Sequence, residues 1–159
     1  MLTPERVLSL FDVRGGCLYW KQPRKNVRVG ERAGGIDSRG YYRVMVDQKN
    51  YYVHRILYML YHGHTPVFID HKDGNTANNS KRNLRACTSA QNAHNRKRPV
   101  NNTSGVKGVY WNVNKQKWMA RVMVQGKRKF VGYYEDISAA ERAVKAVRRK
   151  THKEFSRNE

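Results

Sequence analysis

Residues 70–96, DHKDGNTANNSKRNLRACTSAQNAHNR, decide the fold at the centre of this chain. The apolar residues 67–69 come directly before them and predict a strand that ends at residues 70–71. Asp73-Gly74 then predict a turn, and a second short strand is expected near residues 83–85. Thr88 and Gln91 have the spacing of a capping box, so a short helix should follow. The stretch therefore predicts a strand, a loop, a second strand and a helix.

Three side chains of this stretch have the chemistry of a hydrolytic site. Asp70 ends the first strand, and Asn92 falls in the first turn of the expected helix, so the two can face each other. A carboxylate and an amide oxygen suit a hard divalent ion. His71 follows Asp70 directly, and because side chains alternate along a strand it can address a water molecule while Asp70 holds the ion.

The spacing of these residues resembles that of the HNH endonucleases. Asn83 lies 12 positions after His71, and Asn92 lies 9 positions after Asn83, with Asp70 leading the series. The likeness is strongest to the phage and intron-encoded branch, in which the third letter is asparagine. It implies that Asp70 and Asn92 bind the metal, that His71 is the general base, and that the catalytic support residue Asn83 ties the loop together and orients the histidine.

The resemblance also implies a cofactor, a divalent metal that is Mg²⁺ with Mn²⁺ as a substitute. Cys17 and Cys87 have no CxxC partner, so no zinc knuckle is expected. A disulfide between them is not expected in a reducing cytoplasm.

The charge of the chain indicates a polyanionic partner. Lysine and arginine outnumber aspartate and glutamate by 32 to 12, which gives a formal net charge of +20 at pH 7. Surfaces that need only solubility usually mix the two signs. The longest apolar run, residues 56–61, is far shorter than the roughly 20 residues of a membrane span, and we see no secretion signal. We expect a cytoplasmic protein that binds nucleic acid and does not contact a membrane.

The residues before the central stretch predict a small antiparallel sheet with two helices. A helix is expected over residues 3–12, with Thr3 as its cap and Phe11 on its apolar face. Strands are expected over residues 17–20, 41–46 and 51–53, the last two joined by a loop over residues 47–50. A second helix should cover residues 54–62, where His54 is interpreted as structural or phosphate-facing.

The residues after the central stretch predict a basic linker and a second module. Residues 96–98 are Arg96-Lys97-Arg98, and a linker with this charge can follow a DNA backbone. Strands are expected over residues 109–112, 118–125 and 128–134. Ser138 and Glu141 predict a capping box for a final helix that reaches about residue 151.

The order of these elements, with GVYW, KWMARV, RKFVGYY and SAAERA, is similar to the AP2 DNA-binding domain over residues 105–150. In that family the open face of the sheet enters the major groove. Arg128 matches a basic position of the third strand and Phe130 its neighbouring tryptophan, whereas Tyr110 and Arg121 depart from the pattern. A solvated strand face is the alternative, but the density of cations favours DNA contact by residues Arg96, Lys97, Arg98, Tyr110, Arg121, Lys127, Arg128, Lys129 and Phe130.

The sequence therefore predicts an α+β protein: an HNH nuclease domain over residues 1–97 with its ββα-metal core at about 66–97, a linker over 98–104, and an AP2-like domain over 105–153. The expected function is metal-dependent, site-preferring cleavage of double-stranded DNA, of homing or phage type, with one nick per site. The chain is expected to be a monomer or weak dimer with no small-molecule substrate. Two alternatives stay open: a catalytically silent DNA-binding regulator, and an RNA-binding protein, which the lack of an RNP-type motif disfavours.

Overall fold

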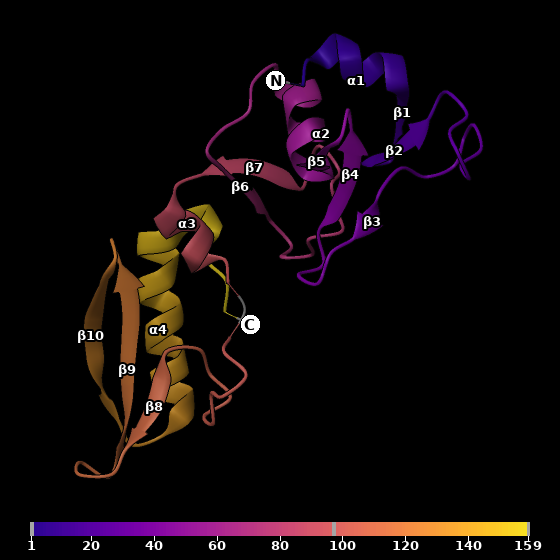
Figure 1. The fold of residues 1–159 in the computed structure, drawn as a ribbon. Helices are drawn as coiled ribbons and strands as arrows, with labels where there is room; N and C mark the ends of the chain where they lie inside the picture. The colour runs from indigo at the N-terminus through magenta and orange to yellow at the C-terminus, as the bar shows by residue number, and fades with distance from the viewer. Residues whose placement is uncertain (1, 97, 159) are drawn as a thin grey trace. The chain divides into compact units, whose positions relative to one another are not determined.

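The computed structural model describes residues 2–96 and 98–158 and divides into two compact units, Met1–Cys87 and Thr88–Glu159. Each unit has its own hydrophobic core. Small antiparallel sheets and four α-helices make up the described part of the chain, which is consistent with the predicted α+β class (Figure 1).

The N-terminal unit begins with a helix and a hairpin. Helix α1 (Pro4–Leu10) starts as predicted, because the hydroxyl of Thr3 accepts a hydrogen bond from the Arg6 amide at 3.3 Å. The prediction that it continues to residue 12 is wrong. Phe11 instead opens strand β1 (Phe11–Arg14), which pairs with β2 (Cys17–Trp20). The intervening glycine pair permits this turn, and the ring of Phe11 is completely buried 4.5 Å from that of Trp20.

The second sheet has the strand order β3-β4-β5. Its strands are β3 (Gly35–Ile36), β4 (Tyr42–Val46) and β5 (Lys49–Tyr52). The hairpin between β4 and β5 is confirmed, but its turn is tighter than predicted. Asp47 and Gln48 both have positive φ, so they form a two-residue turn, and residues 49–50 belong to the strand.

Helix α2 (Val53–His62) supplies the centre of the N-terminal core. Ile56 and Leu57 are buried, as their helical spacing predicts. Gly63 ends the helix in the left-handed conformation, and its amide donates to the Met59 carbonyl at 2.8 Å.

The unit closes with the hairpin predicted from the central stretch. Strand β6 (Phe68–His71) pairs antiparallel with β7 (Leu84–Cys87), and the register sets Asp70 opposite Arg85 and His71 opposite Leu84. The loop between the strands carries the asparagine-rich residues 75–79. Both side chains expected to act in catalysis from this strand are thus fixed at its C-terminal end.

The C-terminal unit is a three-stranded sheet covered by one long helix. Helix α3 (Ser89–His94) comes first, followed by β8 (Val109–Asn112), β9 (Lys117–Val124) and β10 (Lys127–Tyr134), with β9 in the centre. Helix α4 (Ile137–His152) lies across one face of the sheet, as Figure 1 shows, and a short 3₁₀ helix, η1 (Lys153–Phe155), follows it. The core consists of Val109, Ala120, Val122, Ala140 and Val144.

The expected cap of α4 needs correction. Asp136, not Ser138, caps the helix: its carboxylate accepts from the Ala139 amide at 2.8 Å, so the helix begins at Ile137. Aspartate is an equally good cap and stands one half-turn earlier, where it can reach this free amide. In the C-terminal half of the helix, Arg148 is only 3 % exposed although it is charged.

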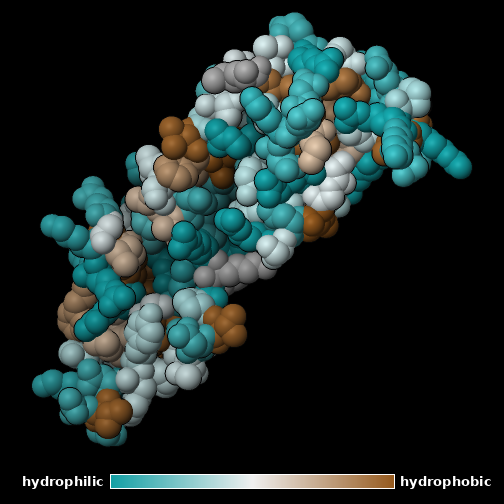
Figure 2. All heavy atoms as spheres, in the orientation of Figure 1, coloured by the Kyte–Doolittle hydropathy of each residue, from teal (hydrophilic) through white to brown (hydrophobic). Residues whose placement is uncertain are grey.

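Hydrophilic side chains predominate on the face of the molecule drawn in Figure 2, in keeping with the excess of basic residues. Cys17 and Cys87 are both free thiols. Among the described residues, no helix is both long enough and apolar enough to cross a lipid bilayer.

Candidate active site

Strand β6 places Asp70 and His71 side by side in sequence but on opposite faces of the hairpin, because side chains alternate along a strand. Each is only 4 % exposed. Charged and titratable side chains are rarely buried to this extent without partners. The neighbours of the two residues therefore define what each can do.

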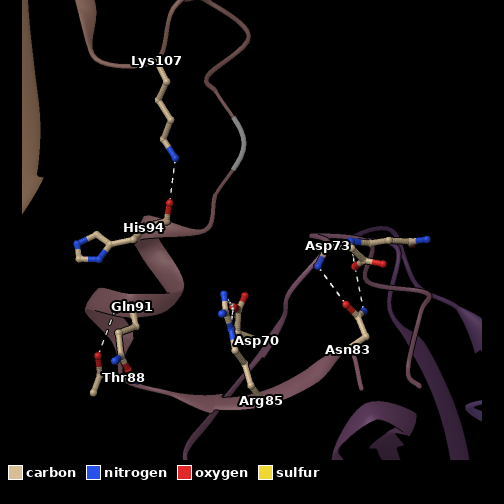
Figure 3. Close-up of polar contacts among 9 residues, drawn as sticks. Asp70, Asp73, Asn83, Arg85, Thr88, Gln91, His94 and Lys107 are labelled. Carbon is tan, nitrogen blue, oxygen red and sulfur yellow. Dashed lines mark hydrogen bonds and ion pairs between the residues drawn. The ribbon is translucent and has the colours of Figure 1, made fainter. Parts of the chain in front are cut away.

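Asp70 forms an ion pair with Arg85, its cross-strand partner. Both Nε and Nη2 of the guanidinium contact carboxylate Oδ2, at 2.8 and 2.7 Å (Figure 3). A buried carboxylate without a counter-charge would be strongly unfavourable, and the register of the hairpin supplies one. Arg85 was not among the predicted site residues, because its role follows from the register of two strands that lie far apart in sequence.

His71 is held by Asn79, which is 2 % exposed in the loop between the strands. The distance from His71 Nε2 to Asn79 Oδ1 is 2.9 Å. An amide oxygen only accepts, so Nε2 carries a proton and donates it to this hydrogen bond. Asn79 thus selects the tautomer of the expected base. Sequence reasoning missed it because it stands in a run of loop asparagines with nothing to distinguish it.

An aromatic cluster surrounds the His71 ring. His54, at the start of α2, lies 5.4 Å from it, and Tyr41 lies 5.9 Å from it, as measured between ring centroids. Burial lowers the pKa of His54 to about 3, and the neighbouring His71 and Arg55 act in the same direction. His54 is therefore a neutral packing partner of the expected base, not a side chain that faces phosphates.

Asn83 braces the loop that carries Asn79. Its side-chain oxygen accepts from the Asp73 amide at 3.0 Å, and its side-chain nitrogen donates to Asp73 Oδ1 at 2.9 Å (Figure 3). The same nitrogen donates to the Asn78 carbonyl at 2.7 Å. Burial opposes the charged form of Asp73, but hydrogen bonds from residues 75, 78 and 83 prevail and lower its pKa. The structure thus places Asn83 in the support of the loop.

Asn92 lies on α3, in the C-terminal unit. The predicted capping box is present: Thr88 Oγ1 accepts from the Gln91 amide at 3.2 Å, and Gln91 Oε1 accepts from the Thr88 amide at 2.7 Å. Asn92 follows in the first turn, half-buried. Asp70 and Asn92 belong to different units. That the two side chains approach each other stays a prediction.

No group of three or more histidine, cysteine, aspartate or glutamate side chains gathers in a metal-binding cluster within residues 2–96 and 98–158. The expected donors are instead one carboxylate, on Asp70, and one amide, on Asn92. Hard oxygen donors of this kind fit Mg²⁺ or Mn²⁺ and not zinc.

The predicted DNA-binding residues of the sheet divide between its two faces. Arg121 pairs with Phe130, Met123 with Arg128, and Tyr110 with Met119, so these six share the face opposite α4. Lys127 and Lys129 pair with Val124 and Val122 and belong to the other face, although both are exposed. Of the basic segment, Arg96 and Arg98 are exposed, and Lys97 lies outside the described residues.

Strand β6 thus ends in the Asp-His pair, and Asn83 braces the loop that follows it. Residues 51–94 match the family described as HNH endonuclease, and the chain belongs to that family. It is similar to Protein 3.8 of Escherichia phage T7, with 32 % identity over 110 residues, which cover 69 % of this chain and 69 % of the phage protein. No solved structure matches. The family match ends at residue 94, so the likeness of the C-terminal unit to AP2 domains stays a proposal.

Proposed function

We propose that this protein is a metal-dependent DNA endonuclease that hydrolyses phosphodiester bonds, one strand per active site. The observation that carries the proposal is the Asp70-His71 pair at the end of β6, with His71 held by Asn79 in the tautomer that a general base requires. The family match and the net charge of +20 also support a nuclease that acts on DNA.

His71 is the proposed general base. With its proton on Nε2, the ring takes a proton from the attacking water at Nδ1. The resulting imidazolium is stabilised because its Nε2–H already donates to Asn79. Asn83 acts on this step indirectly, since it holds the loop that positions Asn79.

Asp70 and Asn92 are the residues that would hold the divalent ion, and Mg²⁺ is the proposed ion, with Mn²⁺ as a substitute. When bound, such an ion stabilises negative charge that develops on the phosphate and the leaving oxygen. Arg85 pairs with the Asp70 carboxylate and fixes it on its strand.

The C-terminal unit is the proposed DNA-holding module, of AP2-like type. Tyr110, Arg121, Arg128 and Phe130 share its open sheet face, where cations and aromatic rings suit phosphate and base-edge contacts. Residues 96–98 would follow the backbone between the two modules. A protein with this organisation would cleave DNA preferentially at particular sites. We expect it to act inside the infected cell, as a phage or homing nuclease. We expect it to work as a monomer or weak dimer.

A plasmid assay tests the proposal. Wild-type protein with Mg²⁺ should convert supercoiled plasmid to the nicked circle, and a chelator should stop the reaction. The His71→Ala variant should bind duplex DNA with unchanged affinity yet leave the plasmid intact. Full cleavage by His71→Ala would refute the assignment of the base.

A catalytically silent DNA-binding regulator is the second candidate. The observation that favours it is the ion pair of Asp70 with Arg85, which already supplies the carboxylate with a cation. The same assay separates the two candidates, since a regulator would bind the plasmid without nicking it at any concentration of Mg²⁺ or Mn²⁺.

A further inference from the structure

A cationic cavity of about 470 Å³ lies within the C-terminal unit, beside the N-terminal end of β8, past which β9 continues. Helix α3, the edge of β9 and the C-terminal half of α4 contribute its walls. Neither aspartate nor glutamate is among its described lining residues, which are Ala93, His94, Arg96, Pro99, Lys107, Gly108, Tyr110, Arg121, Val122, Met123, Arg128, Arg148 and His152.

Two cations, the half-buried Lys107 and the buried Arg148, fix the charge of the inner wall. The Lys107 ammonium donates to the carbonyls of His94, at 3.0 Å, Arg96 and Arg157 (Figure 3 shows the first). Arg148 in turn donates to the Lys107 carbonyl and to Asn158. Burial lowers the pKa of Lys107 to about 8, and the nearby Arg148 contributes. These two side chains hold α3, β8 and α4 together and leave the wall positively charged.

Three further cations are free to bind a ligand. Arg96, Arg121 and Arg128 are exposed, and none of them forms an ion pair with a carboxylate in the part of the chain that the structure describes. Guanidinium groups bind phosphate through paired, charge-assisted hydrogen bonds. The rim of the cavity therefore offers the donors that an anion needs.

A stacked pair of histidines, the half-buried His94 and the buried His152, lines the same cavity. The rings of His94 and His152 stack at 3.7 Å, and His152 is only 7 % exposed. His152 Nε2 lies 2.6 Å from the Met123 carbonyl, so it carries the proton. His152 Nδ1 and His94 Nε2 are buried and have no hydrogen-bond partner among the described residues. Each of these two nitrogens therefore keeps the capacity for one further hydrogen bond.

We propose that this cavity binds one nucleotide unit, with its phosphate on Arg121 and Arg128. Its volume lies within the ~300–1,000 Å³ range of small-molecule sites, larger than a phosphate alone requires. Tyr110, Met123 and Pro99 provide an apolar part for a base or sugar. The nucleotide comes either from a DNA strand or from the free pool. The inference shares Arg121 and Arg128 with the proposed DNA-binding face and is otherwise independent of cleavage.

Calorimetry with a 5′-phosphorylated thymidine dinucleotide tests the proposal, at about 150 mM salt to screen non-specific attraction. Every protein compared in this experiment carries His71→Ala, so that no DNA is cut. Adding Arg121→Gln or Arg128→Gln should each weaken binding about tenfold or more. Arg142→Gln removes the same charge from an exposed position of α4 outside the cavity and should change binding less than about twofold. Equal losses in all three variants would overturn the proposal.

The imidazole of His152 gives a second readout by NMR. A bound phosphate favours the protonated ring, so the dinucleotide should raise the pKa of His152, and an unchanged pKa would contradict the inference. Competition identifies the source of the nucleotide: displacement by thymidine monophosphate alone indicates the free pool, and displacement by DNA indicates a strand. Displacement by neither would refute the site. Failure of the plasmid to be nicked would leave these results standing.

Discussion

Acid should destabilise the N-terminal unit because His54 must take up a proton when the unit unfolds. In the folded protein its ring is 9 % exposed, packed among Tyr41, Tyr52 and His71, and its pKa is about 3. In the unfolded chain the pKa returns to about 6.5. The folded-state pKa is the lower of the two, so the neutral form is favoured by folding. The full stability is present above about pH 6.5 and is lost as the pH falls towards 3.

The magnitude follows from the unfolded-state pKa. At pH 5, 1.5 units below that value, the unfolded state gains about 2 kcal/mol from protonation of this one ring, at about 1.36 kcal/mol per unit. The folded ring stays almost wholly neutral at pH 5, since its own pKa lies about two units lower. Between pH 8 and pH 5, His54 therefore lowers the free energy of unfolding by about 2 kcal/mol.

The assay is urea unfolding at the two pH values, followed by the fluorescence of Trp20. Trp111 and Trp118 are replaced by phenylalanine, so that Trp20 is the single tryptophan of the three in the sequence that remains. His54→Phe keeps an aromatic ring against its neighbours but removes the titration. Between pH 8 and pH 5, the protein with His54 should lose about 2 kcal/mol more of its free energy of unfolding than the His54→Phe variant. Equal losses in the two proteins would refute the reasoning.

Three further perturbations have defined outcomes. Asn79→Ala should slow DNA nicking about 10- to 100-fold, because the base loses its buried orienting partner, while the affinity measured by gel shift stays the same. Arg85→Met should lower the free energy of unfolding by about 3–5 kcal/mol in urea titrations without divalent ions, because it removes the counter-charge of a buried carboxylate; an unchanged midpoint would contradict the role of the pair. Gly108→Ala should destabilise the C-terminal unit clearly more than Gly126→Ala, because both glycines have φ near +79° but only the former would bring a Cβ within 2.4 Å of a backbone carbonyl oxygen; equal thermal shifts would contradict the packing.

The parts of the site that local sequence determines could be predicted. The β6–β7 hairpin follows from an apolar run and an Asp-Gly turn, and the start of α3 follows from the Thr88–Gln91 capping box, whose two hydrogen bonds are both present. These signals depend on interactions between residues a few positions apart. Local competition also explains the errors. Phe11 suits a helix face or a buried strand equally well, and its contact with Trp20 decides for the strand.

The rest of the site depends on pairs that lie far apart in sequence. Asp70 and Arg85 meet only because the hairpin has one register and not its neighbour. His54 reaches the His71 ring because α2 packs beneath the hairpin, and His152 reaches His94 across 58 positions. Such contacts cannot be predicted from the composition of the sequence or from the spacing of its residues. Arg148 lies on the buried face of α4, four positions after Val144, but its partners, the Lys107 carbonyl and Asn158, belong to other segments.

In the proposed nuclease, Asp70 places a negative charge where a phosphodiester must approach, in a protein whose excess of cations favours that approach. Arg85 reconciles the two requirements, because its guanidinium lies 2.7 Å from the buried carboxylate and supplies a counter-charge. The pair as a whole is close to neutral, so it does little to repel DNA held by the surrounding basic residues. In this proposal Asp70 thus offers an oxygen donor without the electrostatic cost that an isolated acid would impose on binding a polyanion.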